Sequence, residues 1–165
     1  MNKINDEIKW TFATETDQLE FGAHLASVCV AGTFIGLQGE LGAGKTTLVR
    51  GFLQHLGYTG RVKSPTFTLL ERYDIESLKI FHFDLYRLND PLELEAIGIR
   101  DYFDGQAIVL IEWIDKAIQQ LPVPDIICTL HILKSGRDIR CKAMTDKGKE
   151  VLTKLNQRVT GYKND

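Results

Sequence analysis

An α/β fold with a partly parallel central sheet and antiparallel additions is predicted for this chain by three features. Residues 33–38 form a credible strand that leads through a glycine-rich loop into a helical repeat of apolar residues. Residues 107–111 are continuously apolar, which suits a central strand covered on both faces. Two pairs of strand-like segments predict antiparallel hairpins, namely residues 66–73 with 78–83 and residues 126–133 with 138–144. Because no composition break divides the 165 residues, we predict a single domain over residues 1–165.

Helical segments are predicted from apolar spacing and from capping residues. They span about residues 14–30, 48–56, 90–98 and 149–157. Thr14 and Asp17 have the spacing of a capping box at the start of the first helix. Gly57 stands where the second helix should be capped. Asp90 is placed to cap the third, with a proline in its first turn.

Residues 39–47 read GELGAGKTT and match the phosphate-binding loop pattern of a glycine, four residues and then Gly-Lys-Ser/Thr. Glycines allow several backbone N–H groups to converge on one anion, and the helix that follows offers its positive end. Lys45 adds a cation for the outer phosphates, and the Thr46 hydroxyl can hold Mg²⁺. The predicted nucleotide-binding residues of the loop are Gly39, Glu40, Leu41, Gly42, Ala43, Gly44, Lys45, Thr46 and Thr47.

Chemistry at an outer phosphate also needs a carboxylate at a strand end to hold magnesium. The predicted strand 78–83 ends at Asp84, and the apolar strand near residue 110 ends at Glu112. Ligands of open α/β sheets bind outside the carboxyl ends of strands, so both acids point to the predicted phosphate site. We predict that Thr46, Asp84 and Glu112 hold Mg²⁺ and that Lys45, Asp84 and Glu112 are catalytic. Either acid could hold the metal directly or through water, or orient the attacking water.

Five further residues near these strands allow a functional or a structural interpretation. Ser64 and Thr66 flank a proline before a strand, and their hydroxyls could sense the outer phosphate or magnesium, as GTPase switch segments do, or form an ordinary turn. His82 lacks a metal-ligand partner and is predicted to be a hydrogen-bonded structural residue. Tyr86 and Trp113 are predicted to be packing residues.

Composition favours an ordinary globular protein and argues against direct nucleic-acid binding. The chain is 44% hydrophobic and 25% charged, and its net charge of −2 gives no overall attraction for phosphate backbones. We therefore expect any tRNA contact to be indirect. The isolated cysteines suggest reduced thiols, the N-terminal residues lack the apolar stretch of a signal peptide, and no apolar run could span a membrane. These observations predict a cytoplasmic location.

Five motifs together resemble the bacterial TsaE family, the small ATPases of threonylcarbamoyladenosine synthesis in tRNA. They are GELGAGKTT at 39–47, KSPTFTL at 63–69, HFDLYRL at 82–88, GIRDYF at 98–103 and LIEW at 110–113. The similarity runs from about residue 14 to residue 140 and gives no support for residues 141–165. The order of five linked motifs is far more specific than the phosphate loop alone.

The resemblance implies a three-layer P-loop NTPase-like fold, with a mostly parallel central sheet and helices on both sides. It implies ATP and Mg²⁺ as cofactors, weak hydrolysis by the protein alone, and activation by partner proteins. It implies as partners the complex of TsaD and TsaB, which transfers threonylcarbamoyl to the adenosine beside the anticodon of ANN-reading tRNAs and which this family resets between turnovers. It also places Ser64 and Thr66 in a switch-like segment. Contacts to the nucleotide are implied for Glu15, Thr16 and Arg137.

Two other functions use the same loop. A small-molecule kinase of the shikimate-kinase type has a similar loop and size, but the sequence shows no clear acceptor-binding pattern. A GTPase would need the Asn/Thr-Lys-x-Asp guanine signature, which this sequence lacks. An ATPase is therefore the preferred interpretation, and the kinase is the alternative.

Overall fold

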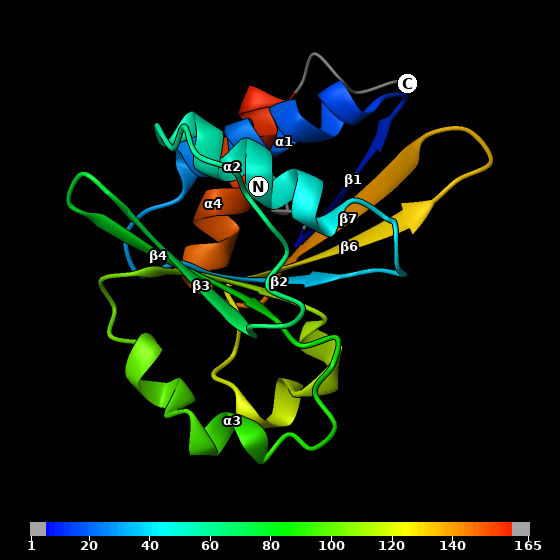
Figure 1. The fold of residues 1–165 in the computed structure, drawn as a ribbon. Helices are drawn as coiled ribbons and strands as arrows, with labels where there is room; N and C mark the ends of the chain where they lie inside the picture. The colour runs from blue at the N-terminus through cyan, green and yellow to red at the C-terminus, as the bar shows by residue number, and fades with distance from the viewer. Residues whose placement is uncertain (1–5, 160–165) are drawn as a thin grey trace.

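The computed structural model describes residues 6–159, and one seven-stranded sheet organises them (Figure 1). The strand order across the sheet is β1-β7-β6-β2-β5-β4-β3. The strands are β1 (Glu7–Phe12), β2 (Phe34–Gln38), β3 (Leu70–Ile75), β4 (Leu78–Asp84), β5 (Ile108–Glu112), β6 (Ile126–Ile132) and β7 (Arg137–Ala143). The helices are α1 (Glu15–Val28), α2 (Lys45–His55), α3 (Glu93–Ala96) and α4 (Asp146–Arg158), with 3₁₀ turns at Ile99–Tyr102, Ile114–Lys116 and Ile118–Gln120.

The centre of the sheet is parallel and its flanks are antiparallel. Strands β6, β2, β5 and β4 pair in parallel, whereas β3, β7 and β1 add antiparallel partners at the two sides. Helices α1, α2 and α4 cover one face, and α3 with the 3₁₀ turns lies on the other (Figure 1). Two hydrophobic clusters correspond to these two faces. The predicted three-layer α/β fold with a mostly parallel centre is confirmed.

Two strand predictions are corrected by the structure. Residues 66–69 are not part of β3, because Leu69 has a φ of 70° and its N–H donates to the carbonyl of Pro65 at 2.7 Å, which closes a turn. Strand β1 was not predicted at all. Its sequence alternates weakly, since only Trp10 and Phe12 of its six residues are buried, and its place is set by pairing with β7.

The helix predictions are correct in place and differ in extent. Helix α1 has the predicted capping box, in which the Thr14 side chain accepts from the backbone N–H of Asp17 at 3.2 Å. The third helix is shorter than predicted, because Asp90 caps a turn instead, accepting from Leu92 N–H at 3.0 Å, and α-helix begins only at Glu93. The last helix begins earlier than predicted, with Thr145 as its N-cap.

Helices α1 and α2 approach each other so closely that only glycine fits at two positions. A Cβ added to Gly22 would lie 2.2 Å from the carbonyl oxygen of Leu48, and one added to Gly51 would lie 2.1 Å from that of Leu19. Both contacts are with backbone, which cannot rotate away. The start of α1 is therefore held at a fixed distance from the phosphate loop, which immediately precedes α2.

We expect Gly51→Ala to lower the free energy of unfolding by about 1–3 kcal/mol, because the added methyl group overpacks this contact. Thermal and urea unfolding followed by circular dichroism would measure the change. Thr153→Ala on the exposed side of α4 is the control and should stay within about 0.5 kcal/mol of the wild type. Equal stability of Gly51→Ala and the wild type would show that the two helices can move apart at no cost.

Cys29, Cys128 and Cys141 are free cysteines in the structure. Cys128 and Cys141 lie opposite each other on β6 and β7, with their Sγ atoms 2.8 Å apart. Burial, and secondarily the neighbouring Cys128, raises the pKa of the Cys141 thiol well above its usual range. Over residues 6–159, no helix has the length and apolar character needed to cross a membrane.

Candidate functional site

The glycine-rich loop connects the end of β2 to the start of α2 and wraps around open space. Gly44 is the N-cap of α2 with a φ of 102°, and an added Cβ there would lie 2.4 Å from Nε2 of Gln18. Gly42 has a φ of 84°, and no heavy atom lies within 4 Å of a Cβ added to it. The loop is thus packed on the scaffold at one glycine and faces solvent at the other. The first N–H groups of α2 lack intrahelical acceptors, so this is a suitable cradle for an anion.

Lys45 lies at the first position of α2 and is buried against the loop. Its Nζ donates to the carbonyl oxygens of Gly39 at 2.5 Å and Glu40 at 3.0 Å, and it stands 4.2 Å from the centre of the Trp113 ring. Burial lowers the pKa of Lys45, while the carboxylates of Glu112 and Asp84 act in the opposite direction. A cation is therefore held inside the loop and beside two acids.

We expect ATP affinity to fall as the pH rises toward the alkaline range, since only the protonated Lys45 attracts phosphate. Because burial lowers its pKa, the loss should begin at a lower pH than for an exposed lysine. The free energy of unfolding of the nucleotide-free chain should change in the opposite direction. The unfolded state binds the Lys45 proton more tightly than the folded state does, so the contribution of Lys45 to stability increases as the pH rises. Calorimetric titration with ATP between pH 7 and 10 would test this, and the slope should be absent in Lys45→Ala.

Glu112 ends β5 and is buried with its carboxylate between two hydrogen-bond donors. Thr46 Oγ1 lies 3.0 Å from Oε1 and 3.2 Å from Oε2, so the hydroxyl donates to the carboxylate. His82 Nε2 lies 2.6 Å from Oε2. Thr46 and Glu112, both predicted to hold Mg²⁺, are thus in direct contact although they are 66 residues apart in sequence.

Asp84 ends β4 and lies beside Glu112, because the two residues are partners in the parallel β4–β5 register. Its Oδ2 accepts from Ser64 Oγ at 2.6 Å and from Thr66 Oγ1 at 2.9 Å. Its Oδ1 accepts from the backbone N–H of Tyr86 at 2.9 Å. The segment that contains Ser64 and Thr66 is therefore hydrogen-bonded to one of the three predicted magnesium ligands.

A cavity of about 340 Å³ brings these groups together. Its lining consists of Leu41, Gly42, Gly44, Lys45, Thr46, Thr47, Ser64, Thr66, Asp84, Tyr86, Glu112 and Trp113. Carboxylate and hydroxyl oxygens are the ligands that Mg²⁺ prefers, and this cation is usually held by one or two carboxylates together with phosphate oxygens. The residues present therefore fit a magnesium ion bound beside a nucleotide phosphate.

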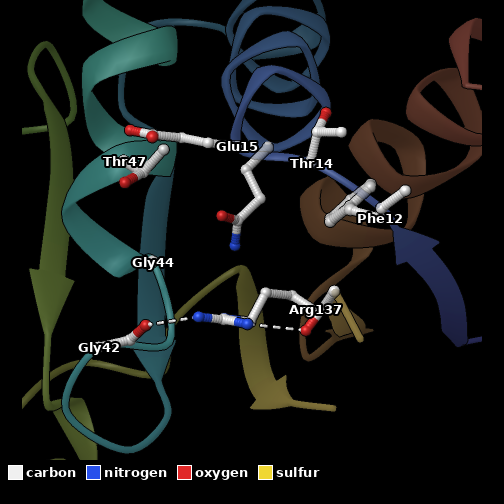
Figure 2. Close-up of a pocket in the computed structure, with 10 residues that line it drawn as sticks. Phe12, Thr14, Glu15, Gly42, Gly44, Thr47 and Arg137 are labelled. Carbon is white, nitrogen blue, oxygen red and sulfur yellow. Dashed lines mark hydrogen bonds between the residues drawn. The ribbon is translucent and has the colours of Figure 1, made fainter. Parts of the chain in front are cut away.

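A second cavity of about 340 Å³ lies on the other side of the loop and shares Gly42, Gly44 and Thr47 with the first (Figure 2). Arg137 on β7 reaches its lower side, donating to the carbonyl of Gly42 at 3.5 Å. Glu15 at the start of α1 lies on its upper side. Two predicted nucleotide contacts, far apart in sequence, thus line one cavity adjoining the phosphate loop.

Two residues of α1 differ from the prediction for the second cavity. Thr16 is exposed and does not line the second cavity, because the N-terminal turn of α1 presents its neighbour Glu15 instead. Gln18, which was not predicted, is buried there, and its Nε2 donates to the carbonyl of Ala43 at 3.0 Å. Its place one turn after the helix cap was the only available sequence signal.

Tyr86 and Trp113, which were predicted to be packing residues, lie against each other with ring centres 5.0 Å apart. They also line the first cavity, which was not predicted. Trp113 has a φ of 60°, unusual for a residue with a side chain, and it directly follows Glu112. The chain leaves β5 in this conformation and places the indole against Lys45. The sequence signal for a role of Trp113 in the cavity was its position next to Glu112.

Comparisons with known proteins give a consistent family. Residues 12–141 match the family model described as "Threonylcarbamoyl adenosine biosynthesis protein TsaE". The tRNA threonylcarbamoyladenosine biosynthesis protein TsaE of Haemophilus influenzae is 46% identical over 144 residues, which are 84% of this chain and 91% of that protein. The protein of the same name from Bacillus subtilis is 38% identical over 134 residues, covering 81% and 82%. The crystal structure of YdiB from Bacillus subtilis superposes with a TM-score of 0.74 at 28% identity, over 92% of this chain and 95% of that one.

Proposed function

The chain belongs to the TsaE family, and from this membership we propose that it supports tRNA threonylcarbamoyladenosine synthesis as a magnesium-dependent ATPase. One observation carries the ATPase part of the proposal. Asp84 and Glu112 end neighbouring parallel strands and line the same cavity as Lys45 and Thr46 of the phosphate loop. A cation, a hydroxyl and two carboxylates around one anion-binding loop are the groups needed for chemistry at an outer phosphate.

Each group has a role in this proposal. The backbone of residues 39–47 cradles the phosphates, and the ammonium group of Lys45 turns from its own loop carbonyls to the outer phosphates. Thr46, Glu112 and Asp84 hold Mg²⁺, which supplies neutralisation of the phosphate charge when bound. One of the two acids accepts a hydrogen bond from the attacking water and orients it. Glu15 and Arg137 bind the remainder of the nucleotide in the second cavity.

The proposed partners are TsaD and TsaB, and the proposed task of hydrolysis is to reset their complex between rounds of threonylcarbamoyl transfer. The modified base is the adenosine beside the anticodon of ANN-reading tRNAs. A net charge of −2 supports an indirect relation to tRNA, because phosphate-backbone binding needs an excess of basic side chains. We propose a cytoplasmic location, because the tRNA that the proposed pathway modifies is present there.

The decisive experiment mixes this protein with the TsaD–TsaB complex, threonylcarbamoyl donor, tRNA and ATP. The ATPase rate should be low for the protein alone and rise on addition of the complex, and tRNA modification should proceed beyond one turnover only when this protein and ATP are present. Multiple turnover without this protein would contradict the proposal. A phosphorylated small molecule formed in step with ADP, in an assay over small acceptors, would favour the kinase alternative.

A further inference from the structure

One buried polar residue behind the candidate site is unused by the proposed function. His82 is in the interior of β4 and is fully buried. It lies on the same side of the strand as Ile80 and Asp84, two residues away in each direction, while Phe81 and Phe83 face the other core cluster. It does not line the cavity that contains Asp84 and Glu112. His82 therefore cannot contact a nucleotide there directly.

Its hydrogen bond runs to the neighbouring strand. His82 is the register partner of Leu110, and its ring reaches diagonally to Glu112, where Nε2 lies 2.6 Å from Oε2. An ionised carboxylate can only accept, so Nε2 carries the hydrogen and donates it. The other ring nitrogen, Nδ1, has no hydrogen-bond partner among the described residues.

A buried histidine with one unpaired ring nitrogen is an unfavourable choice if its role is only to fill space in the core. Burying an imidazole with one nitrogen unpaired costs free energy, whereas an aliphatic side chain would occupy the same strand position at no such cost. The neighbouring interior positions of β4 and β5 are filled in this apolar way, by Ile80 and Leu110. Among the residues that the structure describes, the hydrogen bond that the histidine adds is the one to Glu112.

We propose that His82 is a positioning residue: it holds the Glu112 carboxylate from behind, so that Thr46 and the free lone pairs of that carboxylate face the metal position. This inference rests on the proposed function of Glu112 as a magnesium ligand. Thr46 Oγ1 is 3.0 Å from Oε1 and His82 Nε2 is 2.6 Å from Oε2, so a turn of the carboxylate away from this plane would break a hydrogen bond. Side chains that orient a metal ligand typically change metal affinity or activity by about 10–100-fold when removed.

The two acids are held in different ways. Asp84 accepts from the hydroxyls of Ser64 and Thr66, which line the cavity themselves and belong to the segment before β3. Glu112 accepts from Thr46, which lines the cavity, and also from the His82 ring in the sheet interior, outside the cavity. Glu112 therefore has one hydrogen-bond partner that lies outside the cavity, whereas the two hydroxyl partners of Asp84 both line it.

The test compares His82→Leu with His82→Gln. Leucine fills the space without a donor, and glutamine places an N–H near the position of Nε2. In His82→Leu, we expect the Mg²⁺ concentration for half-maximal ATP hydrolysis in the presence of the partner complex to rise about 10–100-fold. Nucleotide affinity without Mg²⁺ should be unchanged, and His82→Gln should recover most of the loss. The matched control is His131→Leu, which removes another histidine–carboxylate pair, His131 Nδ1 to Asp138 Oδ1 at 2.9 Å.

A crystal structure of His82→Leu provides a readout that does not depend on activity. We expect the Glu112 carboxylate to leave its position beside Thr46, and we expect it to return in His82→Gln. An unmoved carboxylate, or an unchanged Mg²⁺ requirement in His82→Leu, would overturn the inference. Absence of ATP hydrolysis in the wild type would refute the proposed function instead, and the carboxylate position would still decide whether His82 orients Glu112.

Discussion

Glu112→Gln is expected to reduce ATP hydrolysis by about 100-fold or more while ATP remains bound. Removing a carboxylate that orients water or holds the metal typically costs this much, because the attacking water or the metal loses the group that positions it. Glutamine has nearly the same shape, and its carbonyl oxygen can still accept from Thr46. The phosphate loop and Lys45 are unchanged, so calorimetry should find ATP affinity close to that of the wild type. Binding to the TsaD–TsaB complex should also persist.

The functional consequence should appear in the tRNA assay. With Glu112→Gln, modification is expected to stop after a single turnover of the complex, because in the proposed function resetting requires hydrolysis. Glu150→Gln on the exposed side of α4 makes the same chemical change away from the site and should behave as the wild type. If Glu112→Gln supports full multiple turnover, hydrolysis is not what this protein contributes, and ATP binding alone would have to explain its role.

Lys45→Ala is expected to have the second large effect, on binding. A hydrogen bond between an ammonium group and a phosphate contributes about 1.5–3 kcal/mol, so its loss should weaken ATP binding about 10–100-fold. The alanine also removes the bonds from Nζ to the carbonyls of Gly39 and Glu40 and the contact with Trp113. Calorimetric titration with Mg-ATP would measure the affinity, and thermal unfolding would show whether the fold is intact.

The matched control for this charge removal is Lys154→Ala, at an exposed position of α4. It changes the net charge equally and should leave ATP affinity unaltered. Undiminished binding of ATP by a folded Lys45→Ala protein would refute the role of Lys45 as the main cation for the outer phosphates.

The sequence predicted those features that depend on local chemistry. The phosphate loop, the capping box at Thr14 and the hairpin of β6 and β7 are each encoded by neighbouring residues, and the structure has them where they were expected. It did not predict β1, because only two of its side chains are buried and its partner β7 lies at the other end of the chain. The boundary of β3 was wrong because a positive φ at Leu69 cannot be inferred from a leucine.

The same division applies to the site. Asp84 and Glu112 could be selected as strand-end acids, and their adjacency follows from parallel pairing of β4 with β5. The diagonal bond from His82 to Glu112 depends on the exact register of those strands, which no local pattern specifies. The approach of Arg137 to Gly42 likewise depends on how the β6–β7 hairpin lies over the loop. The roles of these residues in binding and catalysis remain predictions.

The hydrogen bond between Thr46 and Glu112 has a consequence for how this chain folds. Its two ends are 66 residues apart, so it forms only after β2 and β5 have paired, and closing a loop of that length carries an entropic cost. A partly folded chain therefore contains the GELGAGKTT segment without the acids that complete the site. A ligand that needs both selects the complete native state and stabilises it by mass action, by about 2.7 kcal/mol at a hundredfold excess over its dissociation constant. With ATP bound as proposed, the ATP concentration would therefore be linked to the equilibrium stability of the folded protein.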